Sequence, residues 1–259
     1  MFRQIAEVYR RTRKPKDILW NRLVARPLAA VLLVPLRATR VTPNQITLLT
    51  LVVFAAGAAM LALWPGWRAL VIAASVIELS YVLDCVDGQL ARLKGTSSPV
   101  GAHLDFLMDE LKAFLLIAAV GIRLWLASGN DRWLIESLLG LVIVASAISL
   151  TTFLRRPEYA AATGAKVGLG AGDYGGGFGQ GSDGESAGAG ASAARKLSPL
   201  RLVEAVGKFV VHYPSYILFV AIADRIDLFL HAYVLMNAAY AARSLLSISL
   251  RLGRGTRTS

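Results

Sequence analysis

Long apolar segments constrain the fold of this chain more than any other feature of its sequence. Six of them are near the length of about 20 residues that a helix needs to cross about 30 Å of hydrocarbon. They cover residues 46–64, 67–92, 104–127, 133–154, 206–223 and 228–250. Only 17% of the 259 residues are charged, whereas a soluble domain carries about 25%. We therefore predict an all-α polytopic membrane protein with six transmembrane helices.

The few charges are strongly unbalanced, with 28 Lys and Arg against 17 Asp and Glu and a net charge of +11. Twenty-one of the cations flank one side of the six segments, and four (Arg68, Arg123, Arg132 and Arg225) flank the other. Cytoplasmic loops of membrane proteins carry such an excess. We predict a multi-pass plasma (inner) membrane protein with both termini in the cytoplasm. The net charge then reflects topology and contact with anionic lipid, and nucleic acid is excluded as a partner.

The sequence divides into a membrane domain, a segment that precedes it and a tail that follows it. Residues 1–42 are predicted to form a basic, amphipathic juxtamembrane segment with a helix on the membrane surface. Residues 43–251 form the six-helix domain and residues 252–259 a basic tail. Within the domain, residues 157–196 are predicted to be a flexible cytoplasmic loop, because residues 164–190 alone contain twelve glycines. A GxGxxG match there (Gly170, Gly172, Gly175) follows no strand, so we do not expect a phosphate-binding loop.

Four aspartates stand at helical spacing around the second and third apolar segments. Asp84 and Asp87 are three residues apart, and Asp105 and Asp109 are four apart. Each pair shares one face of its helix. A short loop around residues 94–101 lets the two helices pack antiparallel, so all four carboxylates are expected to converge near the cytoplasmic boundary of the membrane. The active site is therefore predicted to be cytoplasmic.

Converging carboxylates repel one another unless cations neutralise them. Mg²⁺ and Mn²⁺ prefer oxygen ligands and commonly share them with substrate phosphates. The pattern predicts two such ions clamping a diphosphate. Gly88 and Ala91 lie on the carboxylate face and allow a nucleotide close to the backbone, and Arg92 offers a bidentate donor for phosphate.

The complete pattern resembles the signature of the CDP-alcohol phosphotransferase (CDP-alcohol phosphatidyltransferase) family. It reads Asp84-x-x-Asp87-Gly88-x-x-Ala91-Arg92-x8-Gly101-x-x-x-Asp105-x-x-x-Asp109, and the eight-residue spacer also matches. Upstream, Pro43-Asn44-x-x-Thr47 is similar to the family's entry to its first helix. Six spans after a surface helix also resemble the family architecture.

The resemblance implies transfer of a phospho-alcohol group from a CDP-alcohol to a second alcohol, with release of CMP. It implies that Asp84, Asp87 and Asp105 hold two divalent ions, and that Asp109 completes the site and acts as general base. It also implies a homodimer. The residues implied to bind the CDP-alcohol are Asn44, Thr47, Gly88, Ala91, Arg92, Ser98 and Gly101.

The remaining cations, Arg155, Arg156, Arg243 and Lys112, suit an acceptor that is a phosphorylated alcohol. Lys112 follows Asp109 by three residues, so pairing with the acidic cluster is an alternative role for it. Residues 14–20 and 26–28 are similar to a segment that precedes the catalytic domain in family members making inositol phosphodiesters. These features favour inositol phosphate or inositol as the acceptor. Glycerol 3-phosphate would suit the same basic pocket. CDP-diacylglycerol is the expected donor, and a CDP-polyol is the alternative donor.

Two other functions compete with a transferase. Acidic residues within six spans are also found in divalent-cation transporters, which place them near the bilayer midplane. Here the acids cluster at one end, beside Arg92. A basic membrane-anchored scaffold would leave the aspartate pattern unexplained.

Overall fold

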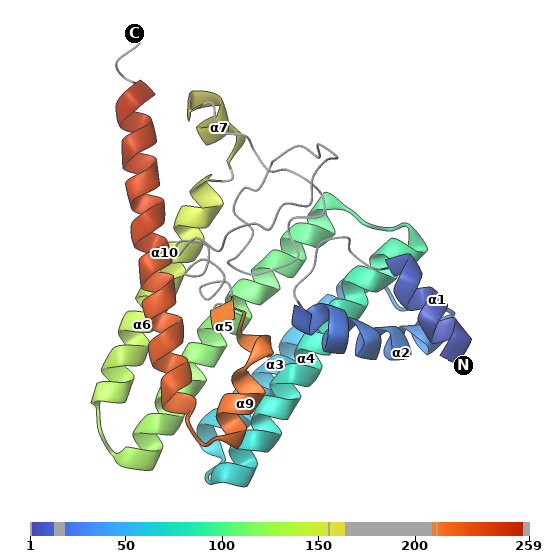
Figure 1. The fold of residues 1–259 in the computed structure, drawn as a ribbon, viewed down its shortest axis with the longest axis horizontal. Coiled ribbons are helices and arrows are strands. Elements are labelled where there is room, and N and C mark those ends of the chain that lie inside the picture. The colour runs from blue at the N-terminus through green and yellow to red at the C-terminus, as the bar shows by residue number, and fades with distance from the viewer. Residues whose placement is uncertain (1, 13–18, 155, 164–208, 211, 256–259) are drawn as a thin grey trace, which may run out of the picture.

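The computed structural model describes residues 2–12, 19–154, 156–163, 209–210 and 212–255, which form helices joined by short turns (Figure 1). No strand occurs among these residues, which confirms the predicted all-α class. The elements are α1 (Phe2–Thr12), η1 (Asn21–Ala25), α2 (Arg26–Leu36), α3 (Pro43–Leu63), α4 (Trp67–Lys94), α5 (Pro99–Ser128), α6 (Arg132–Leu154), α7 (Pro157–Thr163), η2 (Tyr213–Ser215), α9 (Ile217–Ile222) and α10 (Ile226–Gly255).

Four helices, α3 to α6, are long and apolar enough to cross a membrane. They coincide with the first four predicted spans. The fifth predicted span, 206–223, lies partly outside the described residues, and its described part contains η2 and the six-residue helix α9. The sixth coincides with α10, which has 30 residues. Polar residues such as His231, Asn237 and Arg243 interrupt its apolar surface, and it is not among the four.

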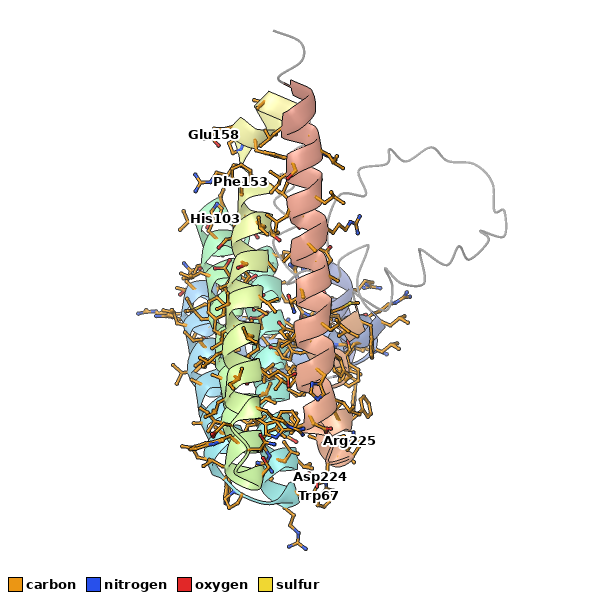
Figure 2. The ribbon with its side chains drawn as sticks, turned by 90° about the vertical axis from the view of Figure 1, so that its left-hand side faces the viewer. Trp67, His103, Phe153, Glu158, Asp224 and Arg225 are labelled. Carbon is orange, nitrogen blue, oxygen red and sulfur yellow. The ribbon has the colours of Figure 1, made fainter. Side chains whose placement is uncertain are left out.

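The core of the bundle lies around α3, on which both α4 and α5 pack closely. Fully buried side chains from each of them meet there, including Phe54, Ile77 and Leu116, and Phe229 of α10 joins the same cluster. The helix α10 runs along α6 (Figure 1). Trp67, Asp224 and Arg225 lie at one end of the bundle, and His103 and Glu158 lie toward the other (Figure 2).

The N-terminal helices form a second, smaller core against α4. Val8 of α1 and Leu33 of α2 are buried with Val86 and Leu90 of α4. The helix α2 runs crosswise to the bundle (Figure 1). The Arg92 Nε donates a hydrogen bond to the Thr12 carbonyl at 3.2 Å. These contacts fix the N-terminal segment beside the C-terminal half of α4, which carries the first two motif aspartates.

Two predicted boundaries differ from the structure. Residues Pro157–Thr163 are helical, although we expected a loop from residue 157. Glu158 in the first turn and the alanines at 160–162 favour this helix, since acids interact well with a helix N-terminus and alanine is the best helix former. The helix α10 also continues to Gly255, into the predicted tail. The GxGxxG match, Gly170 to Gly175, lies outside the described residues.

Candidate active site

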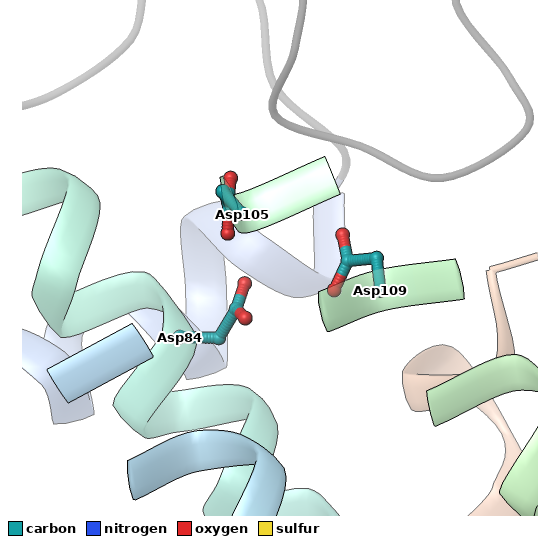
Figure 3. A group of neighbouring side chains, drawn as sticks. All are labelled: Asp84, Asp105 and Asp109. Carbon is teal, nitrogen blue, oxygen red and sulfur yellow. The ribbon is translucent and has the colours of Figure 1, made fainter. Parts of the chain in front are cut away.

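Three of the four motif aspartates come together between α4 and α5. Asp84 lies on α4, and Asp105 and Asp109 lie on α5, one turn apart (Figure 3). Each offers a carboxylate oxygen, and these oxygens all lie within 4.8 Å of one another. The loop of residues 95–98 reverses the chain between the helices. Gly95 makes this possible, since it ends α4 with a φ of 66°, which glycine adopts without strain.

The donor set fits a divalent cation. One oxygen of Asp105, Oδ1, is buried and has no hydrogen-bond partner in the described part of the chain. A buried carboxylate oxygen left in this state is unfavourable, and a cation would relieve it. Three carboxylates are the hard oxygen ligands that Mg²⁺ and Mn²⁺ prefer.

Asp87 is held differently from the other three. It is buried, and its Oδ2 accepts a hydrogen bond of 2.6 Å from the hydroxyl of Thr47 on α3. We expected all four carboxylates to converge, and the compact group of described acids contains only three. Thr47, which we had assigned to the CDP-alcohol, thus contacts a motif aspartate directly.

Lys112 forms ion pairs with two of the acids. Its side chain is 1% exposed, and its Nζ donates to Asp84 Oδ1 at 2.5 Å and to Asp109 Oδ1 at 3.2 Å. We had predicted for Lys112 either a role in binding the phosphate of an acceptor or pairing with the acidic cluster. The structure places its ammonium between two motif carboxylates, as the second of these predicts.

The starts of α3 and α5 bring together three residues predicted to bind the CDP-alcohol. A Cβ on Gly101 would lie 3.2 Å from Ser98 Oγ and 3.4 Å from Asn44 Oδ1. Ser98 caps α5, since its Oγ accepts a hydrogen bond from the Gly101 N–H at 3.0 Å. A side chain at position 101 would therefore crowd Ser98 Oγ and touch Asn44.

The entry to α3 is fixed by a reciprocal cap. The Gln45 N–H donates to Thr42 Oγ1, and the Thr42 N–H donates to Gln45 Oε1. With Pro43 in the first turn, this capping box positions Asn44 beside the loop between α4 and α5. The family-like entry sequence therefore has a structural role as well as a predicted binding role.

The remaining motif residues lie at the end of α4. A Cβ on Gly88 would lie 3.5 Å from the Arg92 Nη1, so the glycine leaves room beside the guanidinium. The Ala91 carbonyl accepts a hydrogen bond from the Thr96 N–H at 2.9 Å. This bond closes the end of α4 one turn after Gly88.

The described residues predicted to bind the acceptor come from different elements. Arg155 lies outside the described residues. Arg156, which follows α6, and Arg243 on α10 are both exposed. Lys112, on α5, forms ion pairs with Asp84 and Asp109.

A polar network lies one turn from Asp84 and was not predicted from the sequence. The Tyr81 hydroxyl donates to Asn21 Oδ1 at 2.6 Å and lies 2.8 Å from His212 Nε2, while His212 Nδ1 lies 2.6 Å from Ser215 Oγ. The one signal available was the spacing of Tyr81, three residues before Asp84.

Comparison with known families shows the family to which the chain belongs. The family model described as CDP-alcohol phosphatidyltransferase matches residues 40–172, which include all four motif aspartates. The chain belongs to the CDP-alcohol phosphatidyltransferase family. The resemblance drawn from the motif is thereby confirmed.

Two curated relatives of this family member are both named bifunctional IPC transferase and DIPP synthase. The one from Rubrobacter xylanophilus is 34% identical over 95 residues, or 35% of this chain and 21% of its own length. The one from Aquifex aeolicus is 26% identical over 111 residues, or 43% of this chain and 25% of its own length. The chain thus matches about a quarter or less of these relatives.

A solved structure is distantly similar to the family member. It is Mycobacterium tuberculosis phosphatidylinositol phosphate synthase (PgsA1) in complex with manganese and citrate. The two share 21% identity with a TM-score of 0.47, over 91% of this chain and 90% of that one.

Proposed function

We propose that the chain transfers a phospho-alcohol group from a CDP-alcohol to the hydroxyl of a small polar acceptor and releases CMP. The observation that carries this proposal is the group of Asp84, Asp105 and Asp109, whose carboxylate oxygens converge within 4.8 Å inside the family motif. Family membership favours this function over a divalent-cation transporter. Metal flux into liposomes without nucleotide would support the transporter instead.

In the proposed mechanism, Asp84, Asp105 and Asp109, together with Asp87, would hold two divalent ions. A bound divalent ion would neutralise the donor diphosphate and the departing CMP. The acceptor oxygen forms a bond to the phosphorus of the phospho-alcohol, and the bond from that phosphorus to the CMP oxygen breaks. Asp109 accepts the proton that the acceptor hydroxyl loses.

The CDP moiety is proposed to lie along the start of α3, the end of α4 and the start of α5. Asn44, Ser98 and Gly101 meet there. Arg92 and Gly88 lie at the end of α4, where close backbone approach and a guanidinium suit phosphate. The residues proposed for this role are Asn44, Thr47, Gly88, Ala91, Arg92, Ser98 and Gly101.

The acceptor is proposed to be inositol phosphate, inositol or glycerol 3-phosphate, and the donor CDP-diacylglycerol. Arg155, Arg156 and Arg243 are the proposed phosphate ligands. The positive charges of these arginines and the sequence similarity of residues 14–20 and 26–28 support this choice. We further propose six spans, an N-terminal surface helix, a homodimer, and a plasma-membrane location with the site in the cytoplasm.

Purified full-length protein in lipid nanodiscs tests the substrates. CMP release is measured with CDP-diacylglycerol and Mn²⁺ against inositol phosphate, inositol, glycerol 3-phosphate and serine. The proposal expects release with at least one of the first three and little with serine. Release with serine alone would contradict the acceptor assignment, and no release with any CDP-alcohol and any acceptor would contradict the reaction.

A further inference from the structure

The side chain of Lys112 is fully buried within α5, and it reaches across to α4. Its Nζ lies 2.5 Å from Asp84 Oδ1 and 3.2 Å from Asp109 Oδ1. Lys112 thereby joins two of the three carboxylates that form the candidate metal group, one from each helix. The family pattern quoted above ends at Asp109 and does not include this position.

A buried ammonium is expensive to desolvate, and a well-packed apolar side chain is usually at least as stabilising. A purely structural reason for lysine here is therefore weak. The neighbouring carboxylates give a better reason for a lysine at this position. They must be close together to bind metal, and without a neighbouring cation they repel one another in an environment of low dielectric constant.

The same position has a second consequence. The ammonium donates hydrogen bonds to carboxylate oxygens of Asp84 and Asp109 that could otherwise bind metal. Its positive charge also repels a divalent cation that approaches the same oxygens. Both effects favour the metal-free state over the metal-bound state. Coulomb interactions between such close charges are large when water is excluded.

We propose that Lys112 is a positioning residue that holds the acidic centre together before metal binds and weakens its affinity for divalent cations. This inference rests on the acidic centre being the metal site proposed above. Lys112 then keeps Asp84 and Asp109 in place in the empty enzyme and makes metal binding readily reversible.

Manganese titration followed by electron paramagnetic resonance tests the proposal, because free Mn²⁺ has a distinct six-line spectrum that is lost on binding. The variants are Lys112→Met and Lys112→Gln in the full chain in nanodiscs. Gln keeps hydrogen-bonding capacity without charge and provides a second variant where Met fails to fold. The matched control is Lys94→Met, since the Lys94 Nζ donates to the carbonyls of Thr39 and Val41 at 2.9 and 2.8 Å.

We expect each uncharged Lys112 variant to bind Mn²⁺ about tenfold or more tightly than the wild type. Its thermal midpoint should fall most without metal and recover with saturating Mn²⁺. The Lys94 variant should keep the wild-type affinity. This combination separates charge at the centre from a general loss of packing.

Other results would overturn the inference. Unchanged or weaker Mn²⁺ binding by both Lys112 variants, with equal loss of thermal midpoint with and without metal, would show that Lys112 only packs. An absence of Mn²⁺ binding in the wild type would overturn the proposed metal site itself, and this inference with it. The two failures are thus distinguishable.

Discussion

Asp109 is the motif carboxylate with the most roles assigned to it. It belongs to the group that fits a divalent cation, and its Oδ1 accepts a hydrogen bond from Lys112. Its other proposed role is to take the proton of the acceptor hydroxyl. An amide at this position keeps the shape of the side chain but can neither accept that proton nor contribute a negative charge.

We therefore expect Asp109→Asn to lower the rate of CMP release by about 10²- to 10⁴-fold, the usual contribution of a general base. The matched control is Asp131→Asn at the opposite end of α5, where the carboxylate accepts a hydrogen bond from Trp125 Nε1. The control should retain nearly full activity. Similar losses in both variants would contradict the role given to Asp109.

The hydrogen bond between Thr47 and Asp87 supports the site from a third helix. Thr47→Val removes the hydroxyl that donates to the buried Asp87 Oδ2 at 2.6 Å and preserves the side-chain shape. We expect the free energy of unfolding to fall by about 1–3 kcal/mol, because a buried acceptor loses its partner. Thermal unfolding in detergent–lipid micelles measures the change.

The control for this substitution is Thr50→Val on the same helix. The Thr50 hydroxyl donates to the Thr47 carbonyl within its own helix, so its loss leaves no buried carboxylate unpaired. We expect a smaller loss of stability. An equal loss in the two variants would show that the bond to Asp87 is not what Thr47 contributes.

Sequence periodicity was sufficient to place Asp84, Asp105 and Asp109 on facing helix surfaces. It could not assign partners, because partners depend on which helix packs against which face. Thr47 meets Asp87 across forty residues of sequence. Lys112 was noted as a possible partner of the acids, yet only the structure shows that its ammonium bridges α4 and α5.

At the scale of the elements, the contact between α5 and α6 depends on a missing side chain. A Cβ on Gly121 would lie 1.7 Å from Ser137 Oγ and 2.5 Å from Ser137 Cβ. The two helices can approach only because position 121 is glycine. Small residues allow such close packing of membrane helices.

Gly121→Ala is therefore expected to destabilise the protein by about 1–3 kcal/mol, despite the higher helix propensity of alanine. Adding Ser137→Gly removes both clashing atoms and should restore most of the lost thermal midpoint. A stable Gly121→Ala protein would contradict the packing of α5 on α6. So would a double variant that is no better than the single one.

The four strongly apolar helices could be predicted from the sequence because their hydropathy is continuous. Helix ends followed local chemistry, as at Thr42 and Ser98, which cap α3 and α5. The region 157–163 was harder, since its alanines adjoin a glycine-rich tract and no strong end signal separates them. The polar α10 was also ambiguous, because its packing against α5 and α6 is not visible in its own composition.

At the scale of the whole molecule, the cation distribution predicts that the two ends of α5 lie on opposite sides of the membrane. Cys85 is the single cysteine of the chain and is buried, so we expect it to react little with a thiol label. Ser97→Cys precedes α5 and Asn130→Cys follows it. Both positions are exposed.

With a membrane-impermeant maleimide on intact cells, we expect Asn130→Cys to be labelled and Ser97→Cys to be protected until the membrane is opened. The opposite pattern would reverse the orientation and place the site outside the cytoplasm. Labelling of both in intact cells would contradict a membrane-spanning α5.

The central claim is that the converging carboxylates form a metal-dependent transfer centre. The most direct test is CMP release from a CDP-alcohol by the purified full chain, with Mn²⁺ present, with the metal removed by a chelator, and with Mn²⁺ restored. We predict release that requires an acceptor alcohol, stops on chelation, returns with Mn²⁺, and is lost in Asp109→Asn. Acceptor-dependent release that continues after chelation, or that is unchanged in Asp109→Asn, would contradict this claim.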